Sequence, residues 1–317
     1  MAKEAAKGGT TAFASAIGPC APEELAGKLA AVTESLAPRS QLLASPGARC
    51  LGAHLEGPFV NPQMAGALPT QWMRPVVARE LAALLKRAGG ITLITVAPEV
   101  HGVIEAIAQL ARRGIAVSLG HSRADASTAA KAVRAGARLV THAFNGMRPF
   151  HHRAPGLLGA ALLDDRLTAM VILDGVHIGP AAFQLLLRCK GPERVILETD
   201  SIRHQRPLRA SFEGGAYYVP GPAWGGGPKT LAGSGATMIE AVRNAAAFAK
   251  ISLRDAVRLA SANPARAIGR AREFGSLEVG KRADLVVFDE RFRVSRTLVG
   301  GRVVYQQGQT PQAQRLD

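Results

Sequence analysis

The chain has 317 residues, 47% of them hydrophobic, and a formal net charge of +15. This length fits one large α/β barrel or two medium domains, and the hydrophobic content is ample for a core. No apolar run approaches the roughly 20 residues that a membrane-spanning helix needs, and the N-terminal stretch MAKEAAKGGTT lacks the apolar core of a signal peptide.

The positive charge raises the question of nucleic-acid binding, because clustered basic residues neutralise phosphates. The basic side chains are scattered over segments such as LARRG and VRAGAR, however, and aromatic residues make up only 5% of the chain. We therefore expect neither a nucleic-acid nor a membrane partner, and a modest attraction for anionic small molecules. Cys20, Cys50 and Cys189 form no CxxC pair and indicate reduced, mostly buried thiols in a cytoplasmic protein.

Short apolar runs alternate with helical patterns up to Asp200, which is typical of repeated βα units and a parallel sheet. Seven runs are predicted to be strands: 10–17, 49–56, 91–99, 115–121, 138–144, 167–175 and 194–200. Helices are predicted between them at 23–37, 77–89, 100–114, 126–136 and 180–191. A closed barrel of this class has eight strands, so the count predicts a barrel that is one strand short.

The pattern changes after Asp200. Residues 202–230 are rich in Gly, Pro and Arg and are predicted to form a hairpin or a loose excursion. Ser234 is predicted to be the N-cap of a helix through MIEAVRNAAAFA, and SLRDAVRLAS gives a further helix. The last segments, ADLVVFDE, RVSRTLV and GRVVYQQG, alternate like antiparallel strands.

Ionisable residues stand at the ends of six of the seven predicted strands. They are Glu56, Glu99, His121, His142, Asp174 with His177, and Asp200. Catalytic residues of a parallel barrel lie at the carboxyl ends of its strands, so this shared position indicates one active site. Singly, each residue has an ordinary alternative, as a carboxylate that caps the following helix or a histidine that is only hydrogen-bonded.

Glu56, His121 and His142 offer one carboxylate and two imidazoles, a ligand set that suits Zn²⁺ or Fe²⁺ with a position left for water. Such a metal lowers the pKa of bound water and polarises a carbonyl oxygen. Asp200 could accept the proton of the water and return it to a leaving amine. The pattern therefore predicts metal-assisted hydrolysis of an amide or ester.

Eight motifs in this order resemble those of the N-acetylglucosamine-6-phosphate deacetylase family, in the amidohydrolase superfamily. They are HLEGPFVNP (54–62), TVAPE (95–99), GHS (120–122), THAFNGMRPFHHRAPGLLGAAL (141–162), DGVHIGP (174–180), TDS (199–201), LAGSGATM (231–238) and GSLEVGKRADLVVFDE (275–290). The resemblance implies a TIM-like (β/α)8 metal-dependent hydrolase barrel without its first strand, over residues 1–274. Residues 275–317 would be the C-terminal strands of a small β-sandwich.

The resemblance also implies roles for individual residues. Glu56, His121 and His142 match ligands of one divalent metal ion, with zinc expected first and iron as the alternative, and Asp200 matches the catalytic acid and base. The positions that match binding of the sugar phosphate are Asn145, the backbone of Gly146, and His177. Arg153 matches an arginine that reaches the phosphate in the neighbouring subunit, which implies a homodimer. His151 and His152 are expected only to shape their loop.

The sequence departs from the family pattern at several places. Leu68 occupies the position of a histidine that helps to polarise the substrate carbonyl, and 202–230 match poorly. No HxH motif is present, so a second metal held by such a pair is not expected. We expect additional sequence upstream of Met1, roughly 50 to 80 residues, that supplies the eighth strand.

The expected activity is metal-dependent deacetylation of N-acetylglucosamine 6-phosphate to glucosamine 6-phosphate and acetate. Two alternatives stay open. One is a truncated or non-catalytic relative that binds metal or sugar phosphate without turnover, and the other is an amidohydrolase for a different amide, which only Leu68 favours.

Overall fold

The computed structural model describes residues 1–36, 47–202, 210–221 and 228–308. Its main sheet has seven parallel strands that neighbour one another in chain order. They are β1 (Ala12–Ile17), β2 (Arg49–Glu56), β3 (Ile91–Val96), β4 (Ala116–Leu119), β5 (Leu139–Val140), β6 (Thr168–Ile172) and β7 (Val195–Glu198). The predicted barrel with one strand too few is therefore confirmed.

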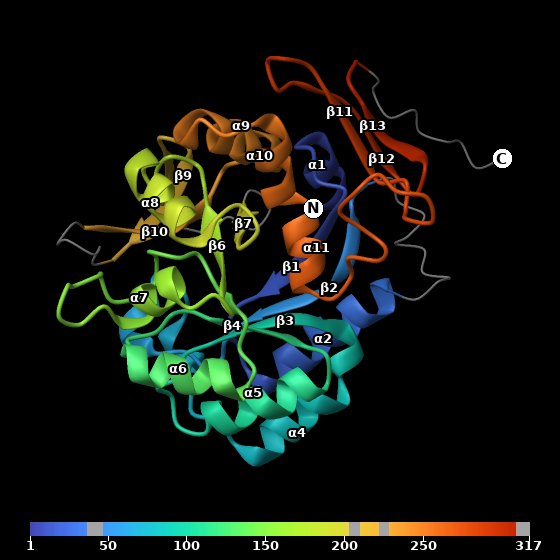
Figure 1. Ribbon diagram of the computed structural model, residues 1–317. Helices are drawn as coiled ribbons and strands as arrows, with labels where there is room; N and C mark the ends of the chain where they lie inside the picture. Colours follow the sequence, from blue (N-terminus) through green and yellow to red (C-terminus); the bar gives the residue numbers. More distant parts are fainter. Residues whose placement is uncertain (37–46, 203–209, 222–227, 309–317) are drawn as a thin grey trace.

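Helices that follow the strands cover the outer face of this sheet (Figure 1). They are α2 (Pro22–Ser35), α4 (Ala78–Lys86), α5 (Val103–Arg112), α6 (Ala126–Ala135), α7 (Gly156–Leu163) and α8 (Pro180–Lys190). In α5 the buried residues are Val103, Ala106, Ile107 and Leu110, the spacing of one helical face turned to the sheet. The sequence prediction missed α7 because GLLGAALL is apolar all round and shows no helical period.

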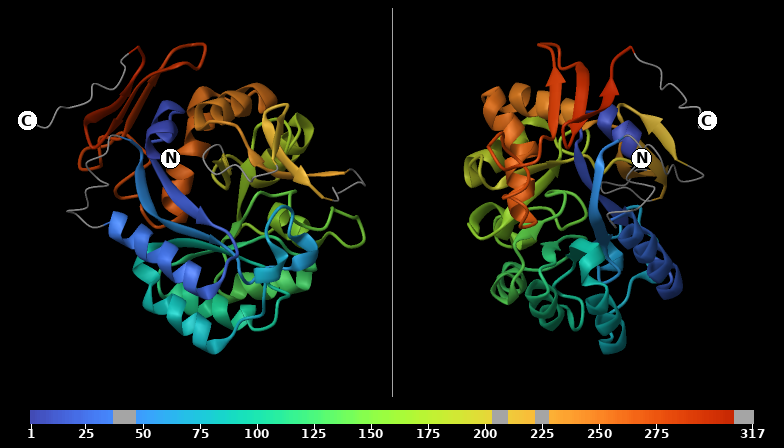
Figure 2. Two further views of the ribbon diagram at one scale, coloured as in Figure 1. Left: turned by 180° about the vertical axis from the view of Figure 1, so that it is seen from behind. Right: turned by 90° about the vertical axis from the view of Figure 1, so that its right-hand side faces the viewer.

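Two small antiparallel sheets follow the parallel one. The first contains β8 (Ser211–Glu213), β9 (Ala216–Pro220) and β10 (Lys229–Ser234), so the predicted hairpin is present where residues 202–230 are described. The second contains β11 (Leu285–Phe288), β12 (Val294–Val299) and β13 (Arg302–Gln306). It lies beside α1 (Ala2–Lys7), and the hydroxyl of Thr297 donates to the carbonyl of Ala6 at 2.7 Å (Figure 2). A domain boundary after residue 274 stays a prediction.

The helices that follow β10 are α9 (Met238–Ala249), α10 (Leu253–Ala260) and α11 (Ala262–Ala267). The predicted N-cap of α9 is wrong, because Ser234 belongs to β10 and the cap is Thr237. The Thr237 side chain accepts the Glu240 N–H, and the Glu240 carboxylate accepts the Thr237 N–H at 2.7 Å. This reciprocal capping box satisfies two backbone donors that a lone serine could not.

Short connections complete the described secondary structure. The loop after β2 contains two 3-10 turns, η1 (Pro62–Met64) and η2 (Thr70–Trp72), and η3 (Ala88–Gly90) precedes β3.

Within the described ranges, no helix is long and apolar enough to cross a bilayer. The three cysteines are free, but only Cys20 is buried and Cys189 is exposed, so the expectation of mostly buried thiols is wrong.

The strands β1 and β7 are the edges of the parallel sheet, with no β1–β7 pairing among the described residues. Between them lies a central cavity of about 370 Å³, lined by inward side chains of several strands and by residues of α11. Asn263 of α11 donates to the carbonyl oxygens of Pro192 and Val195 at 2.7 Å, and so occupies acceptors along the free edge of β7. The cavity lining includes Glu56, His142 and Asp200 at the carboxyl ends of strands, which are among the predicted site residues.

Candidate active site

The predicted metal ligands meet at the carboxyl ends of three strands. Glu56 is the last residue of β2, and His121 and His142 follow β4 and β5 by two residues each. All three are buried. The Glu56 Oε1 atom lies 2.9 Å from His121 Nε2 and 3.3 Å from His142 Nε2, and the two Nε2 atoms are 3.0 Å apart. One donor atom from each residue thus converges on a single point, as a metal site requires.

Backbone carbonyls determine which nitrogen of each imidazole faces that point. His121 Nδ1 lies 2.7 Å from the Met64 carbonyl oxygen, and His142 Nδ1 lies 3.1 Å from the Asn145 carbonyl oxygen. A carbonyl can only accept, so each Nδ1 carries a hydrogen and each neutral ring presents the Nε2 lone pair inward. Two lone pairs and a carboxylate would repel one another unless a cation lies between them. The donor set therefore fits a divalent metal ion, and histidines oriented through Nδ1–H are the usual arrangement at such sites.

The electrostatics of the cluster favour positive charge at the same point. Burial opposes ionisation of Glu56, but hydrogen bonds from His121 and His142 outweigh it and hold the Glu56 pKa well below its ordinary value. Burial also acts to lower the His142 pKa, yet the hydrogen bond and charge of Glu56 raise it to about 9. Both shifts show that the surroundings of this point stabilise positive charge, as a cation site requires.

The backbone is strained at the same positions. His121 has φ 47°, His142 φ 28° and Asp200 φ 43°, in the left-handed region that L-residues seldom adopt. Half of the six described non-glycine residues with positive φ are therefore proposed site residues, and such strain is typical of functional sites.

Gly146 lies directly against two of the ligands. A Cβ at this residue, which has φ +59°, would come within 3.1 Å of both His121 Nδ1 and His142 Cε1. The Gly146 carbonyl accepts the Ser122 N–H at 3.0 Å, which holds the loop after β5 against the loop after β4. A glycine is required here because the backbone and the two imidazoles approach too closely for a side chain.

Asp200 lies two residues beyond β7 and lines the central cavity together with Glu56 and His142. Burial, followed by the negative charge of Glu56, raises the Asp200 pKa from an ordinary 3.8 to about 6. An aspartate with a pKa near neutrality can both accept and release a proton during a reaction. The geometry therefore brings the predicted acid and base to the predicted metal ligands.

His177 is held by the carboxylate of Asp174, which follows β6 by two residues. The Asp174 carboxylate accepts the backbone N–H groups of Val176 and His177 at 2.8 Å, and lies 2.7 Å from His177 Nδ1. Hydrogen bonds and the charge of His177 lower the Asp174 pKa although burial acts in the opposite sense. With Nδ1 bonded to Asp174, the Nε2 atom of His177 is the one left for a ligand.

The loop after β5 carries the remaining predicted binding residues. The Asn145 side-chain nitrogen is buried and has no hydrogen-bond partner, although a buried amide of this kind ordinarily finds an acceptor. Arg153 is exposed, and its guanidinium lies 2.9 Å from the ring of His152. His151 and His152 lie on the surface next to Arg153 and outside the three-ligand cluster. An unpaired buried donor beside the ligands is what an anionic or carbonyl group of a substrate would satisfy.

Two residues in the surrounding loops organise the site from outside. The Glu99 carboxylate accepts from Asn61 at 2.9 Å, from the Ser122 hydroxyl at 2.7 Å and from the Arg123 N–H, so it joins three loops. Leu68 packs against a small apolar cluster formed by Val60, Ala65, Met73 and Ala97. Glu99 is thus a strand-end carboxylate with a structural role, the ordinary alternative for such a residue.

The sequence prediction missed two polar groups inside the barrel. Glu198, on β7, accepts the His142 N–H at 2.7 Å. His54 begins a chain of side-chain hydrogen bonds inside the barrel. Its ring lies 2.8 Å from the Thr95 hydroxyl, which is bonded to the Thr141 hydroxyl at 2.7 Å, and the Thr141 hydroxyl is bonded to the Ser118 hydroxyl at 2.6 Å. Burial lowers the His54 pKa to about 4, so this histidine is neutral. For His54 the available signal was alternation along the strand, since His54 and Glu56 share one face of β2.

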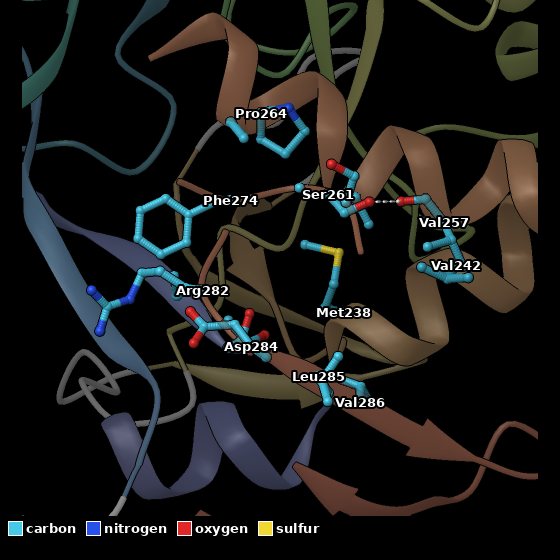
Figure 3. Close-up of a pocket in the computed structure, with 18 of the residues that line it drawn as sticks. Met238, Val242, Val257, Ser261, Pro264, Phe274, Arg282, Asp284, Leu285 and Val286 are labelled. Carbon is cyan, nitrogen blue, oxygen red and sulfur yellow. Dashed lines mark hydrogen bonds between the residues drawn. The ribbon is translucent and has the colours of Figure 1, made fainter. Parts of the chain in front are cut away.

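A second pocket, of about 360 Å³, lies among α9, α10, α11 and β11 (Figure 3). Met238, Val242 and Val257 give it an apolar wall, and Arg282 and Asp284 stand at one edge. It contains none of the metal-ligand candidates, whereas Glu56 and His142 line the central cavity.

Comparison with known proteins agrees with this geometry. The model of the amidohydrolase family matches residues 1–304. An N-acetylglucosamine-6-phosphate deacetylase of Bacillus subtilis is 38% identical over 262 residues, which are 82% of this chain and 66% of the relative. An N-acetylgalactosamine-6-phosphate deacetylase of Escherichia coli O157:H7 is 36% identical, over 81% of this chain and 69% of the relative.

A solved structure is similar over almost the whole chain. It is an aspartate-to-alanine variant of the Mycobacterium smegmatis N-acetyl-D-glucosamine-6-phosphate deacetylase, in complex with N-acetyl-D-glucosamine-6-phosphate. The TM-score is 0.81 at 33% identity, and the match covers 95% of this chain and 78% of that one. The chain spans 66% of the length of the Bacillus relative. It belongs to the amidohydrolase family, whose members depend on metal ions, and within it to the N-acetylglucosamine-6-phosphate deacetylase group.

Proposed function

We propose that this protein is a metal-dependent deacetylase that hydrolyses N-acetylglucosamine 6-phosphate to glucosamine 6-phosphate and acetate. The observation that carries the proposal is the convergence of Glu56, His121 and His142 on one point, with Asp200 lining the same cavity as Glu56 and His142. The names of the relatives supply the substrate, since curated relatives with 36–38% identity act on N-acetylated hexosamine 6-phosphates.

In this proposal one divalent cation is held by the Glu56 carboxylate and the Nε2 atoms of His121 and His142. Zinc is the expected ion and Fe²⁺ the alternative, because one oxygen and two imidazole ligands suit both. A bound cation would polarise the amide carbonyl and lower the pKa of water in the site.

The other residues move the proton and hold the substrate. Asp200 takes a proton from the attacking water and delivers it to the amide nitrogen as the C–N bond breaks, so that acetate and the free amine leave. The unpaired Asn145 amide, the Gly146 backbone and His177 Nε2 are the proposed donors and contacts for the sugar phosphate. The buried unpaired Asn145 nitrogen, the close approach of Gly146 to His121 and His142, and the bond of His177 Nδ1 to Asp174 support these roles. These assignments of single residues are part of the proposal.

We further propose that the protein is a cytoplasmic homodimer that acts on a small molecule rather than on nucleic acid. The three free cysteines support a reducing compartment. The exposure of Arg153 supports a role across a subunit interface, since its side chain is accessible and it is not one of the three metal-ligand candidates.

Mixing two inactive variants tests whether Arg153 of one subunit contributes to the active site of the other. A dimer of one Arg153→Ala subunit and one Asp200→Asn subunit contains one site with both an intact Asp200 and the arginine of the other subunit. Activity should therefore reappear when the two variants are unfolded together and refolded, and not when either is refolded alone. Inactive mixed dimers would contradict the exchange of Arg153.

The activity itself is tested by measuring acetate release from three compounds with the zinc-loaded protein. N-acetylglucosamine 6-phosphate should be hydrolysed, and N-acetylglucosamine without phosphate should be a poor substrate. N-acetylgalactosamine 6-phosphate tests the substrate named for the Escherichia coli relative. Binding of metal and sugar phosphate without acetate release would favour a non-catalytic protein and contradict the proposal.

A further inference from the structure

Glu198 is a carboxylate that the proposed reaction does not use. It is the last residue of β7 and lines the central cavity together with Asp200, which follows it by two residues. No lysine or arginine in the described ranges forms an ion pair with it. Its hydrogen-bond partner is the backbone N–H of His142, at 2.7 Å. A carboxylate placed inside a barrel without a cationic partner is costly, so a specific role is expected.

The bond spans two strands that are not neighbours. In the sheet β6 lies between β5 and β7, so the Glu198 side chain crosses the inner face of β6 to reach His142. The residues on either side of His142 keep ordinary ladder bonds, from Thr141 N–H to the Leu119 carbonyl and from Ala143 N–H to the Met170 carbonyl. The His142 N–H alone turns into the barrel, where Glu198 accepts it.

This turn is what directs His142 at the other ligands. His142 has φ 28°, which a histidine adopts only when its surroundings stabilise that conformation. On one side its Nδ1 is held by the Asn145 carbonyl, which fixes the ring, and on the other its N–H is held by Glu198, which fixes the main chain. Burial raises the Glu198 pKa to about 7, and an oxygen of either the ionised or the neutral carboxyl group can accept this N–H. Ring and backbone are thus fixed by different groups.

We propose that Glu198 is a positioning residue of the metal site: its side-chain oxygen holds the His142 backbone in the turn that aims Nε2 at Glu56 and His121. Glu198 itself is not one of the three converging ligand candidates. The inference rests on the proposed role of His142 as a ligand.

Three variants of Glu198 separate this role from a role of its charge. Glu198→Leu removes the acceptor, and the affinity for Zn²⁺ should fall by about 10- to 100-fold, as for other groups that orient metal ligands. Glu198→Gln keeps an oxygen at the same distance and should restore most of the affinity. Glu198→Asp keeps the charge but is one methylene short, and should behave like the leucine variant; it also serves if the leucine variant does not fold.

The matched control is Asn263→Leu. Asn263 also stabilises β7, but at the opposite end of the strand and away from His142. This variant should lower the unfolding temperature of the metal-free protein and leave Zn²⁺ affinity unchanged. Loss of affinity in Asn263→Leu equal to that in Glu198→Leu would show that any weakening of β7 releases the metal, and would overturn the specific role.

Two measurements are needed: Zn²⁺ affinity by competition with a chelator, and the visible spectrum of the Co²⁺-loaded protein, which reports ligand geometry. Weak binding and a changed spectrum in the leucine and aspartate variants, with recovery in the glutamine variant, are the expected result. Equal affinity in all variants, or equal loss in the glutamine and leucine variants, would overturn the proposal. A parent protein that does not bind metal, or that binds it equally well as His142→Ala, would instead refute the metal site itself.

Discussion

Replacing Gly146 by alanine should weaken metal binding through a contact that can be isolated from backbone strain. The new Cβ would lie 3.1 Å from His121 Nδ1 and from His142 Cε1, closer than ordinary van der Waals contact. The loop cannot simply withdraw, because the Gly146 carbonyl accepts the Ser122 N–H at 3.0 Å. The two imidazoles must therefore move by a few tenths of an ångström.

The magnitude follows from the tolerance of metal coordination. Ligand distances in a stable site lie within about 0.2 Å of their ideal values, so the displacement exceeds what the site accepts. We expect the affinity for Zn²⁺ to fall about tenfold or more, which corresponds to about 1.4 kcal/mol. The left-handed backbone costs a further amount, about 1 to 2 kcal/mol of folding stability, because alanine has a Cβ.

Gly66→Ala is the control for that backbone cost. Gly66 has φ +58°, against +59° for Gly146, but a Cβ there would meet only His121 Cε1, at 4.0 Å. Both variants should lose similar folding stability in thermal unfolding of the metal-free protein, and only Gly146→Ala should lose metal in a chelator competition. Unchanged affinity in Gly146→Ala, or an equal loss in both variants, would refute the account of Gly146.

Three further predictions concern turnover. Asp200→Asn should keep its metal and lose on the order of 10² or more in kcat, and equal rates would remove Asp200 from the mechanism. Burial and the charge of Glu56 raise the Asp200 pKa to about 6, and Asp200 must be ionised to act as a base. We therefore expect kcat/KM to be maximal above pH 6 and to fall as the pH drops through the Asp200 pKa, which a bound cation would shift to a lower value by favouring the carboxylate. A value of kcat/KM that is constant from pH 7 to pH 4 would contradict this. Leu68→His should increase kcat, because a histidine that supplies a missing oxyanion donor lowers the activation barrier by up to about 3 kcal/mol. The variant should also lose some folding stability, since Leu68 packs against Met73. A variant no faster than the parent would show that another group already stabilises the oxyanion.

Much of the site could be predicted from the sequence because parallel strands end at one edge. Short apolar runs located the seven strands, and reading the residue at each carboxyl end brought Glu56, His121, His142 and Asp200 together without any knowledge of distances. The same rule included Glu99, which the structure places in a loop-joining role. A position at a strand end predicts that a residue lies near the active site, but it does not predict which way its side chain points, because that direction depends on the fold.

The features that were missed depend on contacts between distant segments. Glu198 looked like an ordinary residue of an apolar strand, and its bond to His142 spans 56 residues of sequence. The closeness of Gly146 to two imidazoles follows from how two loops pack, and the contact of its backbone with the sugar phosphate stays a prediction. By contrast, the Thr237 cap is visible in the sequence as Thr followed three residues later by Glu, a pattern that identifies the N-cap better than a lone serine such as Ser234 does.

The central claim is that Glu56, His121 and His142 hold a metal ion required for hydrolysis of N-acetylglucosamine 6-phosphate. The most direct test is acetate release by metal-free protein as Zn²⁺ is added in steps, with His142→Ala in parallel. The account predicts no release without metal, activity that rises until one equivalent of metal is bound, and no rise in the variant. Acetate release that is independent of added metal, or an equal rise in His142→Ala, would contradict it.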